Sequence, residues 1–342
     1  MIPFRAEFFD RQLNYKFFSV VERSEIKMDY LTLDKTSLSI SSVVEVNRGW
    51  FCRIVQGPEE LFQGVVSSVT QNKSSTTVAL SPMISLFDTP IYKDRTTYKK
   101  TNLEGWIAGI LTENFAIHNG VDGVVENLKD FSATAQTSTN GIALGLKDNI
   151  HNFWSDISKK AIEKGKIAIE CSFDPQNKTI SASVKSYAGY SEITLEADLP
   201  NVIDQNFTLN DRGSSTNKCL IINQDNETTR TIITADYYAP PTVFSVEKVT
   251  VESGKSFASV ASERAAEVFK SSEFDNLIEL KYRQDDLIIP AIKIGQPCRV
   301  IKGSNVYRTV LTGTVLKGGT KTLIFGGIRV DLTKILKLKG AL

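Results

Sequence analysis

The chain has 342 residues, of which 41% are hydrophobic, 23% charged and 9% aromatic. This composition is typical of soluble globular proteins and excludes a largely disordered chain, while the length favours two to four folded units. The formal net charge of +1 excludes an overall electrostatic attraction to nucleic acid or to an anionic membrane surface. The first residues, MIPFRAEFFDRQ, lack the apolar core of a secretion signal, and no later segment reaches membrane-spanning length, so we expect no membrane anchor.

The first quarter of the chain is predicted to be rich in β-strands, because short apolar runs alternate with polar residues between Gly, Ser, Asn and Asp. Aromatic residues, with Phe8 and Phe17 among them, crowd the first twenty positions. Two interpretations stay open for these rings, the alternating core of a strand or anchors of a protein interface. Strands are predicted at Tyr30–Leu33, Trp50–Val55, Gly64–Val69 and Thr76–Leu80.

Two helices are predicted in the middle of the chain. Apolar residues between Leu103 and Leu111 recur at the spacing of one helical face, behind a capping box formed by Thr101 and Glu104. A second helix is predicted from Asn152 to Lys164 and ends at Gly165, a residue that favours helix termination.

Strict alternation after the second helix predicts a β-hairpin made by Ile167–Phe173 and Ile180–Val184. The stretch between the two helices, Ser132–Gly145, is rich in small polar residues and is expected to be a surface excursion. Further elements are predicted downstream: strands at Cys219–Ile222 and Thr231–Thr234, a helix behind Ser256 as N-cap, and a β-rich segment from about Phe274.

A short segment near the start recurs near the end. Gly49–Gly57 and Gly295–Gly303 share their two glycines and a Cys-Arg pair, Cys52-Arg53 in one and Cys298-Arg299 in the other, at matching offsets. Two branched aliphatic residues follow the arginine in each copy, and each copy leads into further β-like runs. A chance match between two glycine-bounded strands is the alternative, but we favour a true duplication because Cys-Arg at a fixed place is a demanding match.

Few residues offer chemistry. The four cysteines lie far apart and are expected to be free thiols in the core, and neither His118 nor His151 has a metal-spaced partner. The closest acidic pair, Asp285-Asp286, is more typical of an exposed turn than of a catalytic dyad. No nucleophile elbow, phosphate loop or dinucleotide motif occurs. The sequence therefore predicts no catalytic residue, no cofactor and no metal, and the chain is not expected to be an enzyme.

Several stretches of the sequence resemble the tail or baseplate hub proteins of long-tailed bacteriophages. The layout of a β-unit at each end, a mixed insertion between them and no catalytic motif is similar to theirs. The stretches that carry the resemblance are Leu31–Asp34 with Thr36–Leu38, Ser85–Ile91, Ile221–Arg230, and Leu311–Gly313 through Gly327–Lys334.

The resemblance implies an α+β protein, mainly β, with a small tube-like β-barrel at each end and a mixed α/β insertion between them. The expected domains are an N-terminal barrel at 1–95, an α/β insert with two helices and a hairpin at 96–190, a β-rich insert ending in a connecting helix at 191–271, and a C-terminal barrel at 272–342. Proteins of this kind form homotrimers whose six barrels make a pseudo-sixfold ring.

Such a ring implies a structural hub in the virion tail, made in the bacterial host cytoplasm. Its expected partners are other copies of itself, the distal tail protein ring, and the tail fibre, tip or tape-measure protein, with DNA passing through the lumen without sequence-specific binding. Candidate interface or lumen residues are Arg53, Arg299, Phe8 and Phe17, although packing of each arginine stem on its own barrel is the favoured alternative. Two other functions stay open, a glycan-binding adhesive tail-tip protein and, less favoured, a cell-wall hydrolase.

Overall fold

The computed structural model describes most of the chain and is mainly β, with 54% strand and 16% helix, as expected of an α+β protein. No helix in this described part is long and apolar enough to cross a membrane. The described residues are 3–29, 32–94, 102–124, 128, 130–136, 144, 146, 148–165, 167–186, 190–208, 218–234, 244–251, 254–269, 276–284 and 292–326.

The chain divides into two compact units. The larger unit combines Met1–Gln205 with Glu279–Phe325, and the smaller unit is Asn206–Ile278. The division into four domains that the sequence predicts is not tested by these two units and stays a prediction.

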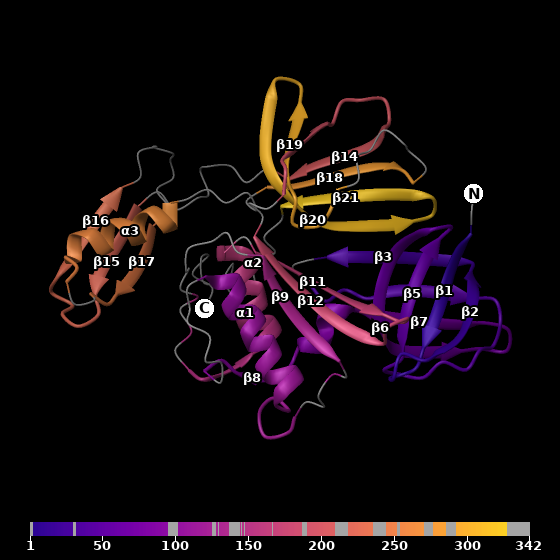
Figure 1. Ribbon diagram of the computed structural model, residues 1–342. Coiled ribbons are helices and arrows are strands. Elements are labelled where there is room, and N and C mark those ends of the chain that lie inside the picture. The colour runs from indigo at the N-terminus through magenta and orange to yellow at the C-terminus, as the bar shows by residue number, and fades with distance from the viewer. Residues whose placement is uncertain are drawn as a thin grey trace. The chain divides into compact units, whose positions relative to one another are not determined.

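The N-terminal part of the larger unit contains seven strands in chain order (Figure 1, indigo to purple). Asp10 stabilises the turn between the first two strands. Its carboxylate accepts hydrogen bonds from the backbone N–H groups of Gln12 and Asn14 and forms an ion pair with Lys16. The strands are β1 (Phe4–Phe9), β2 (Tyr15–Val21), β3 (Arg23–Asp29), β4 (Thr36–Ile40), β5 (Phe51–Gln56), β6 (Glu59–Gln71) and β7 (Thr76–Pro82).

The C-terminal part of this β structure draws strands from two distant segments of the chain. Its strands are β13 (Ile193–Glu196), β14 (Val202–Thr208), β18 (Leu277–Arg283), β19 (Pro297–Lys302), β20 (Asn305–Lys317) and β21 (Thr320–Gly326). The pair Gly318-Gly319 has positive φ angles of 57° and 75° and forms the β20–β21 turn.

The two β-rich parts share one sheet of 13 strands, whose main order is β14-β18-β21-β20-β3-β4-β7-β6-β5-β1-β2. The join is the antiparallel pairing of β20 with β3, which matches Gly313 with Asp29 and Lys317 with Glu25 (Figure 1). This order does not close on itself. A single hydrogen bond from the Glu22 N–H to the Ser39 carbonyl links the end of β2 with β4, and no closed barrel is present among the described residues. The two predicted barrels are therefore not established.

The strand prediction near residue 30 was wrong in placement. Thr32 and Leu33 belong to no strand, Tyr30 and Leu31 lie outside the described residues, and the strand here is β3, with the sequence RSEIKMD. The charged residues of β3 interrupt the apolar alternation by which a half-buried strand is predicted. Pairing with its two neighbouring strands, rather than an apolar face, places β3 in the sheet.

A second layer of the larger unit contains the predicted helices. The elements are η1 (Met83–Phe87), β8 (Pro90–Tyr92), α1 (Leu103–Thr112), η2 (Glu113–Ile117), β9 (Phe131–Gln136), β10 (Ile150–Asn152), η3 (Phe153–Ser158), α2 (Lys159–Gly165), β11 (Ile167–Asp174) and β12 (Thr179–Ser186). The β11–β12 hairpin is confirmed, with Ile169 opposite Val184 in its register. A shared core of aromatic and aliphatic side chains, Phe87, Phe115 and Phe153 among them, lies between these helices and strands.

Three details of this layer differ from the predictions. The N-cap of α1 is Asn102, whose side chain accepts a hydrogen bond from the Gly105 N–H at 2.7 Å, and Thr101 lies outside the described residues. The second helix begins with a π-helical turn, η3, before α2. Part of the expected surface excursion is a strand, β9, which pairs in parallel with β12. β9 is an edge strand of the sheet β11-β12-β9, and such small residues can form it because tertiary packing, rather than propensity, decides the outcome.

The smaller unit is a three-stranded sheet, ordered β16-β15-β17, with a helix packed on it. Cys219 and Ile221 of the sheet and Ala261 and Ala265 of the helix are buried together, and the helix N-cap is Ser256, as predicted. The elements are β15 (Lys218–Asn223), β16 (Arg230–Thr234), β17 (Phe244–Val249) and α3 (Phe257–Phe269), drawn in orange in Figure 1.

Candidate assembly surface

The glycines that bound the two copies of the repeated segment have matching backbone conformations. Gly49 and Gly295 precede the strands β5 and β19 with φ angles of 84° and 85°, and Gly57 and Gly303 follow them with φ angles of 59° and 56°. These left-handed conformations explain why both copies keep glycine at both ends. A 13-residue strand and then a 7-residue strand follow in each copy, β6 and β7 in the first, β20 and β21 in the second.

The correspondence extends to a β-bulge in the long strand of each copy. The register shifts at Val66/Ser68 in β6 and at Leu311/Gly313 in β20. The extra residue in each bulge carries a hydroxyl that donates to the partner strand: Ser67 Oγ to the Ala79 carbonyl at 3.0 Å, and Thr312 Oγ1 to the Ile324 carbonyl at 3.2 Å. Bulges are specific features, so their agreement supports duplication over chance.

The agreement also covers the order of the strands. The main sheet order contains β14-β18-β21-β20 followed directly by β3-β4-β7-β6, so each half of the order has its long bulged strand at the same end. We call each of these sets a four-strand repeat. The outer neighbours of β5 and β19 differ, because β1 pairs with β5 antiparallel whereas β13 pairs with β19 in parallel.

The two predicted arginines occupy equivalent places in the repeat, and each binds an acid. Arg53 donates from Nε at 2.9 Å and from Nη2 at 2.6 Å to the Glu7 carboxylate, which Arg5 also contacts. Arg299 donates from Nε at 3.0 Å to Glu192, just before β13. Both arginines therefore bind an acid of their own chain, and a contact with a lumen or a neighbouring subunit stays a prediction.

The predicted aromatic residues separate by burial. Phe8 is fully buried and stacks on the half-buried Phe17 with their ring centroids 5.0 Å apart, so in the single chain Phe8 is a core residue. The exposed rings of this region are Tyr15 and Phe18 on β2, which with Val20 are each more than half exposed. Alternation along β2 separates Phe17 from Phe18 and Val20, but the sequence does not say which of these faces is buried.

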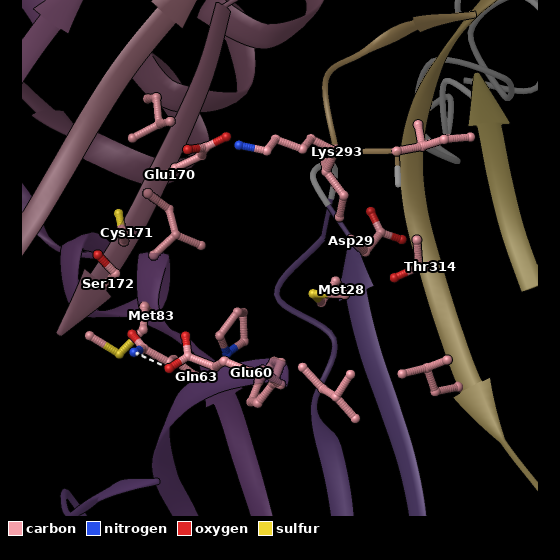
Figure 2. A pocket seen from close by; sticks show the side chains of 18 of the residues that line it. Met28, Asp29, Glu60, Gln63, Met83, Glu170, Cys171, Ser172, Lys293 and Thr314 are labelled. Carbon is pink, nitrogen blue, oxygen red and sulfur yellow. Dashed lines mark hydrogen bonds between the residues drawn. The ribbon is translucent and has the colours of Figure 1, made fainter. Parts of the chain in front are cut away.

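A cavity of about 520 Å³ lies in the larger unit between the β6–β7 region, β11, β20 and the segment before β19. Figure 2 shows Met28 and Met83 on its wall and Lys293 extending its amino group towards Glu170. Two hydroxyls on the cavity wall, those of Ser158 and Thr314, are buried without a hydrogen-bond partner in the described structure. No sequence signal marked this cavity, because its lining comes from seven separate stretches of chain.

Glu170 is the most constrained acid of the cavity. Desolvation acts to raise its pKa, but hydrogen bonds from Lys185 and Tyr190 and the nearby charge of Lys293 outweigh that effect, and the pKa is lowered. A carboxylate with a lowered pKa stays ionised at neutral pH and is a poor general acid. Glu170 therefore gives the cavity wall a carboxylate that is charged at neutral pH.

The other candidates for chemistry have structural partners. His151 Nε2 lies 2.7 Å from the Asp148 carbonyl, and burial raises the pKa of the Cys298 thiol to about 12, as it raises that of Cys52. A thiol of raised pKa is not a reactive nucleophile at neutral pH. Within the described residues, no group of His, Cys, Asp and Glu is placed to hold a metal ion, and Asp285-Asp286 lies outside them.

No family model matches the chain, and no curated protein matches it by sequence. Solved structures match its fold over nearly the whole length. One is a tail protein from Neisseria meningitidis MC58, with a TM-score of 0.57, 11% identity, and coverage of 97% of this chain and 99% of that one. Another is the 43 kDa tail protein of prophage MuSo2 from Shewanella oneidensis, with a TM-score of 0.61, 12% identity, and coverage of 96% and 97%. A chain of the phage P2 baseplate in its activated conformation has a TM-score of 0.52 and 12% identity, and the match covers 95% and 100%.

Proposed function

Because the chain has the fold of phage tail and baseplate proteins, we propose that it is a structural component of a phage tail or a tail-like particle. The finer proposal is a homotrimer that forms a pseudo-sixfold ring, joins the distal tail tube to the tip, and encloses the path of DNA or of the tape-measure protein. Its expected place is the virion tail.

The observation that carries the proposal is the four-strand repeat, present twice in one chain and joined edge to edge by β20 and β3. Three chains with two repeats each present six similar units around one axis, which suits contact with a sixfold tube. A single compact enzyme has no need of such a duplication. The paired arginines fit a structural role too, since each is bound to an acid rather than set beside a substrate site.

The two alternatives receive less support. A cell-wall hydrolase of the usual kind needs an acid of raised pKa facing a second carboxylate, whereas the pKa of Glu170 is lowered. An adhesin needs an exposed aromatic cleft, and the exposed rings of Tyr15 and Phe18 lie instead along the edge strand β2.

The test is the mass and shape of the purified full-length protein. Light scattering is expected to give three times the chain mass of 37.9 kDa, and negative-stain images are expected to show rings with six lobes. A monomer that forms no ring, even when it is mixed with tail-tube and distal tail proteins, overturns the proposal. Release of soluble fragments from purified cell wall would support the hydrolase instead.

A further inference from the structure

Among the strands that the structure describes, half of one edge of β6 has no neighbour, although the equivalent edge of β20 has one. Residues Asn305–Val310 of β20 pair with β19, and Gly313–Lys317 then pair with β3. In the first repeat, Glu59–Val65 of β6 pair with β5, but Ser68–Gln71 pair only with β7 among the described strands.

Burial follows this difference in pairing. Ser68, Thr70 and Gln71 of β6 are exposed, whereas Gly313 and Leu316, at two of the corresponding places in β20, are buried. The missing neighbour therefore leaves accessible a surface that its counterpart covers.

Antiparallel geometry shows which backbone groups of β6 are open. The Asn72 N–H donates to the Ser75 carbonyl at 3.0 Å across the hairpin turn. Hydrogen-bonded and non-bonded pairs alternate from there, so Thr70 and Ser68 direct their N–H and C=O groups to β7. Val69 and Gln71 direct theirs to the open side. A row of unpaired peptide groups of this kind is a template for another strand.

The complementary edge is β14, which ends the main strand order beside β18. β14 is the first strand of one four-strand repeat and lies beside β18, just as β3 is the first strand of the other repeat and lies beside β4. Ile203 of β14 is 51% exposed, and Asp204, Asn206 and Thr208 are exposed as well. The chain thus ends its repeat order in β14 at one side and in the open half of β6 at the other.

From these edges we infer that β6 of one copy pairs, through Ser68–Gln71, with β14 of the next copy, repeating between chains the β20–β3 pairing within the chain. This inference deepens the proposed ring and rests on it. Every join around the ring is then of one kind, a long bulged strand against the first strand of the next repeat. Such a head-to-tail contact closes into a ring when its rotation allows.

The test compares three variants of the full-length protein by light scattering across a dilution series. Gln71→Pro removes the open N–H and is expected to raise the concentration of half-assembly at least tenfold. Gln71→Ala loses only the side-chain hydrogen bond to the Val44 carbonyl and is expected to assemble as the unaltered protein does. Lys73→Pro places a proline in the exposed turn two residues on and is also expected to assemble normally.

Cross-linking gives a second, independent measurement. Thr70→Cys is combined in turn with a cysteine at Ile203, Asp204, Gln205 or Asn206, and at least one combination is expected to give disulfide-linked dimers and trimers on oxidation. The β6–β14 join is overturned, and the ring left intact, if three results occur together. The unaltered protein is trimeric, the Gln71→Pro variant assembles equally well, and no cysteine combination links the chains. An unaltered protein that stays monomeric would overturn the ring itself.

Discussion

Replacing Phe8 by alanine separates the core role of the N-terminal aromatics from an interface role. Phe8 is fully buried and its ring stacks on Phe17, whereas Phe18 on the neighbouring strand is 55% exposed. A buried Phe removes about 150–250 Å² from water. At about 25 cal/mol/Å² this gives an upper bound of about 4–6 kcal/mol, and Phe→Ala substitutions in cores cost about 3–5 kcal/mol. More than half of the Phe18 side chain is already in contact with water in the folded protein, so Phe18→Ala is expected to lower the free energy of unfolding by about 1 kcal/mol.

The assay is urea unfolding followed by tryptophan fluorescence, at a concentration below assembly. The three tryptophans, Trp50, Trp106 and Trp154, all belong to the larger unit, so the signal reports that unit. Trp50 also packs against the same core as Phe8. Equal loss of stability in the Phe8→Ala and Phe18→Ala variants would refute the assignment of Phe8 to the core.

Four other substitutions test the larger unit by the same unfolding assay. Glu7→Ala leaves Arg53 without its buried acid and is expected to cost about 1–3 kcal/mol. Glu192→Ala removes the acid of Arg299 at an exposed pair and is expected to cost below about 1 kcal/mol, so equal costs would contradict the difference in burial. Desolvation acts to raise the pKa of Asp10, but hydrogen bonds from Lys16, Asn14 and Gln12 outweigh it and lower the pKa from 3.8 to about 2. The ionised Asp10 therefore contributes fully to the free energy of unfolding above about pH 4, and this contribution is lost as the pH falls through about 2. The stability difference between the unaltered protein and Asp10→Asn is therefore expected to shrink over that range, and a constant difference would contradict it. Gly64→Ala places a Cβ 2.5 Å from a backbone carbonyl oxygen and is expected to cost about 1–3 kcal/mol, and an unchanged urea midpoint would contradict that close approach.

The local elements were predictable where one periodicity persists over several residues. The β11–β12 hairpin and the helix behind Ser256 follow from spacing alone, because alternation and helical faces are local properties. The N-cap at Asn102 was missed by one position, since Thr and Asn are both good N-caps and only the backbone chooses between them.

The candidate site was predictable only in part. Arg53 and Arg299 were found by the repeat, but their acids, Glu7 and Glu192, lie far from them along the chain and outside the repeated segment. No local signal marked β3, because a charged strand is placed by the backbone edges on either side of it.

The sequence by itself determined the duplication, since the glycines that bound each Cys-Arg strand are required by positive φ angles at both ends of both copies. It also determined the periodic elements and the lack of a catalytic motif. The tertiary structure alone decided how the two copies join. Pairing between β20 and β3 links residues nearly the whole chain apart, and it depends on which strand edges remain open after local folding. That choice is made by long-range packing. The same packing left half of one β6 edge without a neighbour among the described strands, and a second copy is proposed to bind there.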